Sequence, residues 1–215
     1  MASKAAADAR GPLSRLARFQ KLRRYVIGAL VLLLLALTLF VRSTWPSDSV
    51  MHEGLEMLGV VLISLGIVGR LWANLYIAGR KAETIVTGGP YSITRNPLYL
   101  FSAVAAAGVG AQIGSIVTTV GFAALCALAF YFVILREERF LAAAFGTPYT
   151  DYMRRVPRFF PRVSLYQEGD TGSFQPRGLL STLLDGLLFF LAMPMFELIE
   201  AAQNSGDLPV LLRLP

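Results

Sequence analysis

Polar residues that could do chemistry gather in two segments of the chain, residues 83–99 and 136–161. The second segment begins with two adjacent acids, Glu137 and Glu138, directly after an apolar run. A helix C-terminus favours cations, so acids in this place indicate that a cationic group binds there. In the first segment, Asn96 followed by Pro97 is typical of a helix start. The free backbone amides of a helix start can bind a carboxylate or another anion. The two segments are therefore the candidate site.

The same residues also allow a purely structural interpretation. Asn96 could do no more than cap a helix, while Arg95 reaches lipid headgroups. One of the two acids could pair with Arg95 or Arg139 while the other is solvated. No metal ligands are predicted: the single cysteine excludes a cysteine-based zinc site, and we expect the single histidine, His52, to be a solvated residue far from the motifs.

Apolar helices must position these segments. The 215 residues are 55% hydrophobic and 16% charged, with a mean hydropathy of +0.56, which is too apolar for a soluble globular protein. A tight turn at residues 113–115 joins two of the apolar runs, and Pro194 is expected to kink the last one. The sequence predicts an all-α integral-membrane bundle of five transmembrane helices. The runs cover residues 25–41, 51–78, 98–112, 116–135 and 179–199.

Basic residues are distributed unevenly among the connecting segments. Of the 20 Lys and Arg, seven lie in residues 1–24, three in 79–97 and seven in 136–178. All three segments fall on one side of the five-helix arrangement, so the positive-inside rule predicts a cytoplasmic N-terminus and an external C-terminus. Nucleic-acid binding is not expected, because the basic and aromatic residues of 145–160 are tethered at a bilayer surface.

Arg70 is the exception, since it lies inside an apolar run. An arginine in the membrane is costly and often functional. Three explanations stay open: the side chain extends toward the cytoplasm, it pairs with Asp185 on the last run, or it binds an acidic lipid, a substrate or a cofactor.

The two polar segments resemble the isoprenylcysteine carboxyl methyltransferase and phospholipid methyltransferase superfamily of integral-membrane enzymes. The resemblance covers residues 76–161. The main departure is Asn96, where many members have histidine; asparagine does not titrate near neutral pH, so a general base is not expected there. The matching residues are Val86, Thr87, Gly89, Tyr91, Arg95, Pro97, Tyr99, Glu137, Glu138, Phe145, Gly146, Tyr149, Tyr152, Val156 and Pro157.

This resemblance implies an S-adenosylmethionine-dependent methyltransferase with a cofactor pocket at the cytoplasmic ends of the helices. A methyl sulfonium is already activated, so such an enzyme mainly aligns donor and acceptor and balances charge. Arg136 or Arg95 would neutralise an acidic acceptor, and Glu138 would orient it. The implied cofactor contacts are Tyr76, Thr84, Ile85, Val86, Tyr91, Asn96, Pro97, Leu98, Tyr99 and Glu137. We expect the acceptor to be a lipid or another small amphiphile, and the location to be the inner membrane of a bacterium.

The expected organisation has five parts, and two other functions stay open. A nicotinamide-dependent (NADPH) membrane sterol or enone reductase has similar last helices, but such enzymes usually have longer chains. A non-catalytic membrane protein could also keep the shape of the pocket. The parts are a basic cytoplasmic segment (1–24), two transmembrane helices (25–75), the methyltransferase core (76–161), a linker (162–178), and the last helix with its tail (179–215).

Overall fold

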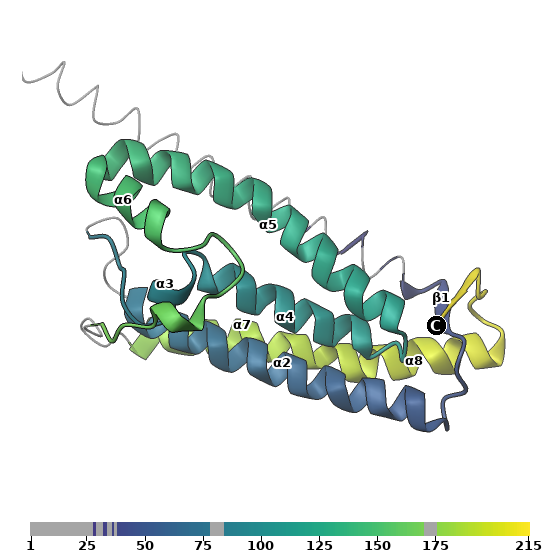
Figure 1. Cartoon of the computed structure of the whole chain (residues 1–215). Helices are drawn as coiled ribbons and strands as arrows, with labels where there is room; N and C mark the ends of the chain where they lie inside the picture. Colours follow the sequence, from purple (N-terminus) through teal and green to yellow (C-terminus); the bar gives the residue numbers. More distant parts are fainter. Residues whose placement is uncertain (1–27, 29–31, 34–35, 37, 78–83, 170–175) are drawn as a thin grey trace, which may run out of the picture. The chain divides into compact units, whose positions relative to one another are not determined.

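The computed structural model describes residues 28, 32–33, 36, 38–77, 84–169 and 176–215 (Figure 1). The chain divides into two compact units, residues 1–39 and 40–215. The second unit carries both polar segments. The basic segment 1–24 and about half of the residues of the predicted helix 25–41 lie outside the described residues, so the expectations for them stay predictions.

The second unit consists mainly of helices, which confirms the all-α part of the predicted fold for the residues described. Its long elements are α2 (Val50–Ile77), α4 (Pro97–Ala111), α5 (Ile116–Phe145), and α7 (Pro176–Leu187) followed by α8 (Ala192–Ser205) (Figure 1). Three short helices accompany them: α3 (Pro90–Ile93), α6 (Thr147–Arg155) and η1 (Val163–Leu165). Two strands, β1 (Val41–Ser43) and β2 (Leu212–Leu214), form a parallel pair that the sequence did not predict.

Three segments are long and apolar enough to cross a membrane, namely Val50–Ile77, Ile116–Phe145 and Gly178–Ser205. They coincide with the second, fourth and fifth predicted runs. The third run is helical as predicted, but its 15 residues extend only about 22 Å, less than the roughly 30 Å of a bilayer core. The described residues thus indicate a membrane protein, and the total of five transmembrane helices stays a prediction.

The fifth run is interrupted close to the proline that was expected to kink it. A 3-10 segment, η2 (Leu188–Leu191), separates α7 from α8. Pro194 is the third residue of α8 and has no N–H to donate to the preceding turn. The proline that was expected to kink this run therefore lies just after a change of helix type, and the kink itself stays a prediction.

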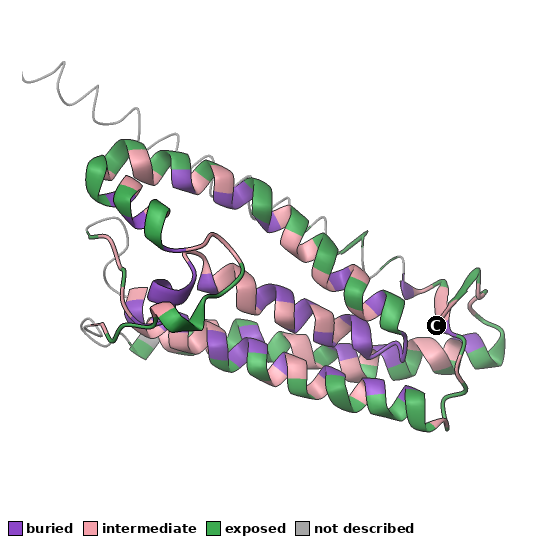
Figure 2. Cartoon of the chain, in the orientation of Figure 1, coloured by how far each residue is buried: buried purple, intermediate pink, exposed green. Residues whose placement is uncertain are grey.

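Glycines bring α2 and α4 into close contact. A Cβ at Gly66 would lie 2.6 Å from the Cβ of Ala105, and one at Gly108 would lie 2.6 Å from the carbonyl oxygen of Gly59. Small residues of this kind let membrane helices approach closely. Figure 2 shows that buried residues gather along α4, which packs against both α2 and α5.

The turn between α4 and α5 lies at the predicted place, with Gly114 at φ +68° and Ser115 capping α5 through its hydroxyl. The expectation for His52 was wrong: the side chain is buried against Gly114, and its Nε2 lies 3.3 Å from the Glu56 carboxylate. The close approach of two segments some sixty residues apart buries this histidine, which no local pattern predicts.

Candidate active site

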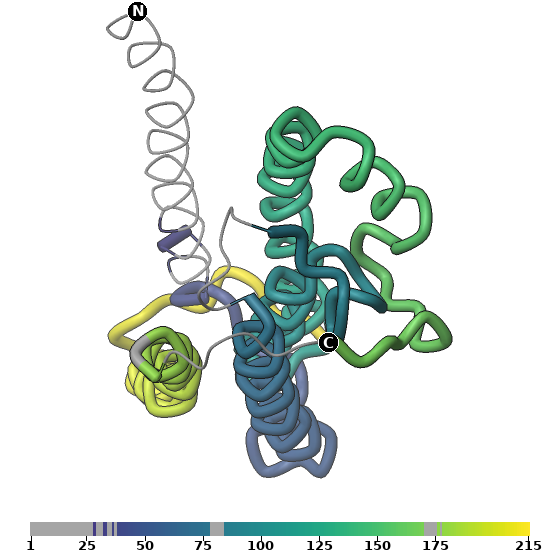
Figure 3. Tube along the Cα trace, turned by 90° about the vertical axis from the view of Figure 1, so that its left-hand side faces the viewer, coloured from purple at the N-terminus to yellow at the C-terminus, as the bar shows by residue number. Residues whose placement is uncertain are grey.

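The two polar segments meet at one end of the second unit, which we call the motif end. It consists of the C-terminus of α2, α3, the start of α4, the last third of α5, and α6; Figure 3 looks onto it. Asn74 near the end of α2 donates to Gly178 O at the start of α7 (3.0 Å), and Gly89 N donates to Gln167 O (2.8 Å). Residues 84–97 and 136–169 therefore lie at the same end, as the predicted five-helix arrangement has them.

Helix α5 continues well beyond the predicted boundary at residue 135 and ends at Phe145, where Gly146 has φ +64°. Leu141 to Ala144 are strong helix formers and extend it past the charged residues. Glu137 and Glu138 therefore lie inside a helix, and the expectation that they oppose a helix-end dipole was wrong. Their side chains reach two different environments.

Glu137 is paired with the start of α4. The hydroxyl of Tyr99 donates to Glu137 Oε2 at 2.9 Å, and the Tyr99 ring packs on Phe130 with 4.6 Å between ring centroids. The side chains of Tyr99 and Glu137 are half-buried. The Tyr99 hydroxyl thus holds the Glu137 carboxylate beside the start of α4.

Glu138 is the centre of a buried charge cluster. Its carboxylate accepts from Arg158 Nε at 3.0 Å and lies 3.0 Å from Arg158 Nη2. Arg95 Nε lies 3.1 Å from the other oxygen, an ion-pair contact without hydrogen-bond geometry, while Arg95 Nη1 donates to Met153 O at 2.7 Å. Only 5% of Glu138 is exposed, so these arginines neutralise a charge that water does not reach.

Asn96 joins this cluster instead of closing the helix. It occupies the predicted N-cap position of α4, but its side chain makes no capping hydrogen bond. The amide donates to Arg158 O at 2.9 Å and to Glu138 at 3.4 Å. The prediction of a side-chain cap was wrong, and the first turn of α4 keeps its amides free of that side chain.

Residues 156–162 form a strap across the α3–α4 junction. Arg95 N donates to Pro157 O (2.9 Å), and Arg162 N donates to Ile93 O (2.9 Å). The hydroxyl of Thr94, which is fully buried, lies 3.2 Å from Arg158 O and 3.1 Å from Phe159 O. The strap and the Glu138 cluster together fix the start of α4 relative to α5.

The Gly88-Gly89 turn lets the chain pass closely over Tyr76. Gly89 has φ +58°, and a Cβ there would lie 2.3 Å from the Tyr76 ring. Tyr76 in turn belongs to a packed cluster with Tyr91 and Ala73, against which Val86 and Leu98 lie. Four of the predicted cofactor residues are therefore brought together.

The Tyr91 hydroxyl is the most unusual polar group at the motif end. It is buried and has no hydrogen-bond partner among the described residues, although Tyr152 donates to the Tyr91 backbone carbonyl at 2.7 Å. Burial, with smaller effects from Tyr152, Tyr99 and Glu137, raises the pKa of the Tyr91 phenol, so it stays a donor. A buried donor without a partner costs about 1–3 kcal/mol, which a bound ligand would recover.

The remaining predicted residues lie elsewhere at the motif end. Ile85 packs on the group formed by Tyr149, Tyr152 and Val156. Thr84 and Arg136 are exposed, and Pro97 is fully buried as the first residue of α4.

Comparison with known proteins identifies the family. A model of phospholipid methyltransferases matches residues 55–148, which include Arg95, Tyr99, Glu137 and Glu138. The chain is 38% identical over 196 residues to the cobalt-zinc-cadmium resistance protein CzcN of Cupriavidus metallidurans, with 90% of each chain covered. The chain belongs to the phospholipid methyltransferase family.

Two further relatives match the chain. The nickel-cobalt-cadmium resistance protein NccN of Alcaligenes xylosoxydans xylosoxydans is 39% identical over 181 residues, covering 80% of this chain and 78% of that protein. A protein-S-isoprenylcysteine O-methyltransferase of Schizosaccharomyces pombe is 30% identical over 127 residues, 58% of this chain and 52% of the relative. No solved structure matches the chain. The family and the yeast relative together indicate a membrane methyltransferase.

Arg158 belongs to the candidate site of this phospholipid methyltransferase family member, but the sequence did not predict it. It was grouped with the aromatic and basic residues expected to lie on the membrane surface. The hydrogen bond to Glu138 raises the pKa of its guanidinium, and the guanidinium carbon lies 5.7 Å from the Tyr131 ring centroid. The sequence offered one signal, namely several arginines in the segment that follows Glu138. It did not indicate which of these arginines contacts Glu138.

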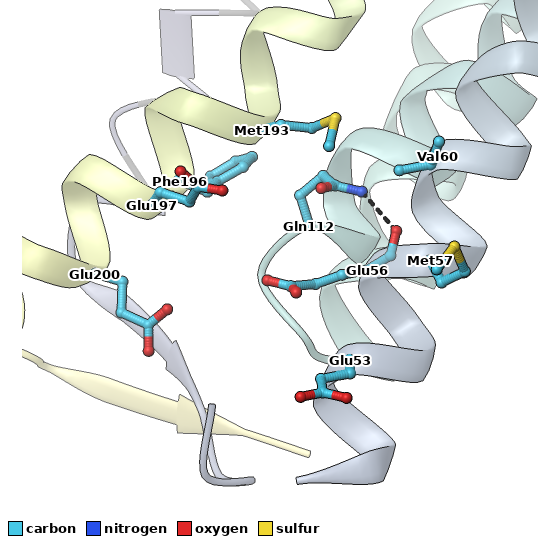
Figure 4. Close-up of a pocket in the computed structure, with 9 residues that line it drawn as sticks. All are labelled: Glu53, Glu56, Met57, Val60, Gln112, Met193, Phe196, Glu197 and Glu200. Atoms are coloured by element: carbon cyan, nitrogen blue, oxygen red, sulfur yellow. Dashed lines mark hydrogen bonds between the residues drawn. The ribbon is translucent and has the colours of Figure 1, made fainter. Parts of the chain in front are cut away.

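A second polar region lies at the opposite end of the unit. A pocket of about 330 Å³ there is lined by acids from α2 and α8 together with Gln112, whose amide donates to Glu56 O at 2.9 Å (Figure 4). Arg42 lies 3.4 Å from Glu200 at its edge. Among the residues that the structure describes, no group of three or more His, Cys, Asp or Glu side chains is arranged to hold a metal ion. The lining residues are Glu53, Glu56, Met57, Val60, Gln112, Met193, Phe196, Glu197 and Glu200.

Proposed function

We propose that this protein transfers a methyl group from S-adenosylmethionine to a lipidic or small amphipathic acceptor. The observation that supports this most directly is the Tyr99–Glu137 pair beside the buried hydroxyl of Tyr91, which has no hydrogen-bond partner among the described residues. Family membership gives the reaction class, and these groups provide what a cationic cofactor with polar substituents needs: one carboxylate and one free donor.

The residues present fit this cofactor. Glu137 would balance its positive charge, and the start of α4, which the Asn96 side chain leaves uncapped, would receive its carboxylate. Tyr91 would donate one hydrogen bond, with the apolar surfaces of Tyr76, Val86 and Leu98 beside it. When bound, S-adenosylmethionine supplies an already activated methyl group, so the chain has to orient it and exclude water.

The acceptor side of the proposal rests on Arg136. Arg95 and Glu138, which the resemblance also assigned to the acceptor, are engaged with each other and with the strap, so we propose that they position α4. Arg136 is exposed on α5 directly before Glu137. An acidic group of an amphiphile at the membrane surface would meet it there.

We further propose that the motif end faces the cytoplasm, in a five-helix bundle of the bacterial inner membrane. The described segments with most of the basic residues lie at that end, which the positive-inside rule assigns to the cytoplasm. Two relatives come from bacteria.

Two relatives are named for resistance to cobalt, zinc, cadmium or nickel, over alignments that include the motif end. We propose that this chain contributes to tolerance of such ions through its methylated product. In a strain lacking the gene, the wild-type chain should restore growth on cadmium, whereas Glu137→Gln should not. Restoration by Glu137→Gln would separate tolerance from methyl transfer.

Calorimetric titration of the purified protein tests the cofactor. Saturable binding of S-adenosylmethionine or its demethylated product is expected, with affinity lowered at least tenfold in Glu137→Gln, because a charge-assisted contact of about 1.5–3 kcal/mol is lost. Glu53→Gln, at the opposite end, is the matched control and should bind like the wild type.

The same titration decides between the remaining functions. A preference for NADPH would favour the reductase. Absence of saturable binding of either cofactor would favour a non-catalytic protein of this fold.

A further inference from the structure

Arg70 lies within the apolar part of α2, seven residues before the helix ends at Ile77. This places it about 10 Å along the axis from the motif end. Its Nη1 donates to Ser102 Oγ at 3.2 Å, and its guanidinium carbon lies 5.8 Å from the Phe189 ring centroid. The Nε atom is buried without a hydrogen-bond partner among the described residues. Most of the five donors of the guanidinium are thus available.

The side chain does not extend toward the motif end, as one of the predicted explanations required. Asn74, one turn closer to that end, contacts Gly178 and Thr182 on α7, and Gly186 packs against Ile67. Phe189 follows Gly186 along the chain, so the guanidinium points away from the motif end and toward the middle of the bundle.

Asp185 does not serve as a paired counter-ion either. The Asp185 carboxylate is near enough to attract the Arg70 guanidinium. Among the described residues, however, no carboxylate lies within 4 Å of Arg70, the limit for an ion pair. The Asp185 side chain is exposed on α7. The predicted helix 25–41 contains no acid. A cation in an apolar interior is costly unless an anion or several hydrogen bonds compensate it.

We propose that Arg70, oriented by Ser102, binds the oxyanion of a membrane amphiphile, a phosphate or a carboxylate, between α2, α4 and η2. A guanidinium offers paired N–H groups that match either oxyanion, and its attraction is strong where water is scarce. Ser102 donates to Leu98 O at 2.8 Å and accepts from Arg70, so its hydroxyl holds the guanidinium in place. This site is distinct from the proposed cofactor site and does not depend on methyl transfer.

Native mass spectrometry of the purified protein tests this site with three probes: phosphatidylglycerol, oleate and diacylglycerol. The wild type should retain phosphatidylglycerol or oleate and should not retain diacylglycerol. Retention of phosphatidylglycerol would indicate a phosphate ligand, and retention of oleate a carboxylate ligand. Arg70→Gln should lower retention at least tenfold, and Ser102→Ala severalfold. Arg139→Gln, which changes an exposed arginine on α5, should retain the wild-type level.

Two results would overturn the proposal. One is equal retention of the anionic probes by wild type and Arg70→Gln. The other is a thermal unfolding cycle in which Asp185→Asn destabilises as much as Arg70→Gln and the double variant no further, since Asp185 would then be the counter-ion. Binding of S-adenosylmethionine by Arg70→Gln should be unchanged, so failure here and failure of the proposed function are separable. If Arg70→Gln does not fold, Ser102→Ala decides.

Discussion

Replacing Glu138 with glutamine should destabilise the protein far more than the same change at its neighbour. Glu138→Gln keeps the size of the side chain but leaves Arg95, whose side chain is 8% exposed, with the Met153 carbonyl as its hydrogen-bond acceptor. Breaking a buried ion pair from one side costs about 3–5 kcal/mol. At about 2–4 °C per kcal/mol for a chain of this length, the melting temperature should fall by roughly 6–20 °C. Glu137 is half-buried beside the Tyr99 hydroxyl, so Glu137→Gln should lower the free energy of unfolding by about 1 kcal/mol.

The single cysteine provides the assay, because a maleimide dye reacts with Cys126 when the protein unfolds and exposes it. The double variant Arg95→Met/Glu138→Gln should melt above Glu138→Gln, since removing both charges relieves the unpaired arginine. A melting temperature of Glu138→Gln within about 2 °C of the wild type would mean that the change costs less than about 1 kcal/mol, and the buried ion pair would then not stabilise the protein as proposed.

Contacts at the motif end lead to three further predictions. Gly89→Ala should melt lower than Gly146→Ala: both have positive φ, a strain of about 1–2 kcal/mol, but only Gly89 also faces the Tyr76 ring. Tyr99→Phe should weaken binding of S-adenosylmethionine roughly fivefold in calorimetry, since Glu137 loses a hydrogen bond of about 1 kcal/mol that orients it. Burial raises the pKa of Tyr149 from its ordinary value of 10.0 to about 12, so its stabilising effect is complete below pH 10 and is lost as the pH rises to 12. Denaturant unfolding of Tyr149→Phe should show a smaller loss of stability over this range.

Much of the helical framework was predictable because it is encoded locally. Gly114 before Ser115 marks the α4–α5 turn, and the apolar runs give the helices on either side. The end of α5 was missed because the predicted boundary lay where hydropathy falls at Arg136, whereas the alanines that follow favour helix regardless of polarity.

The sequence indicated which candidate residues would lie near one another, but not which of them would form pairs. The ordered motif placed Tyr99 and Glu137 together, and the structure joins them by a hydrogen bond. The partners of Glu138 depend on how α6 and the strap fold back, which sets Arg158 against it across 20 residues of chain. A long-range reversal of this kind has no local sequence signal.

Transfer of a labelled methyl group tests directly whether the protein methylates an amphiphile. Purified protein in vesicles made from bacterial lipid extract would receive S-adenosylmethionine carrying tritium in its methyl group, and the extracted amphiphiles would be counted. We expect protein-dependent label in that fraction, reduced at least tenfold by Glu137→Gln and unchanged by Glu53→Gln. Label that is independent of the protein, or equal with Glu137→Gln, would contradict this expectation.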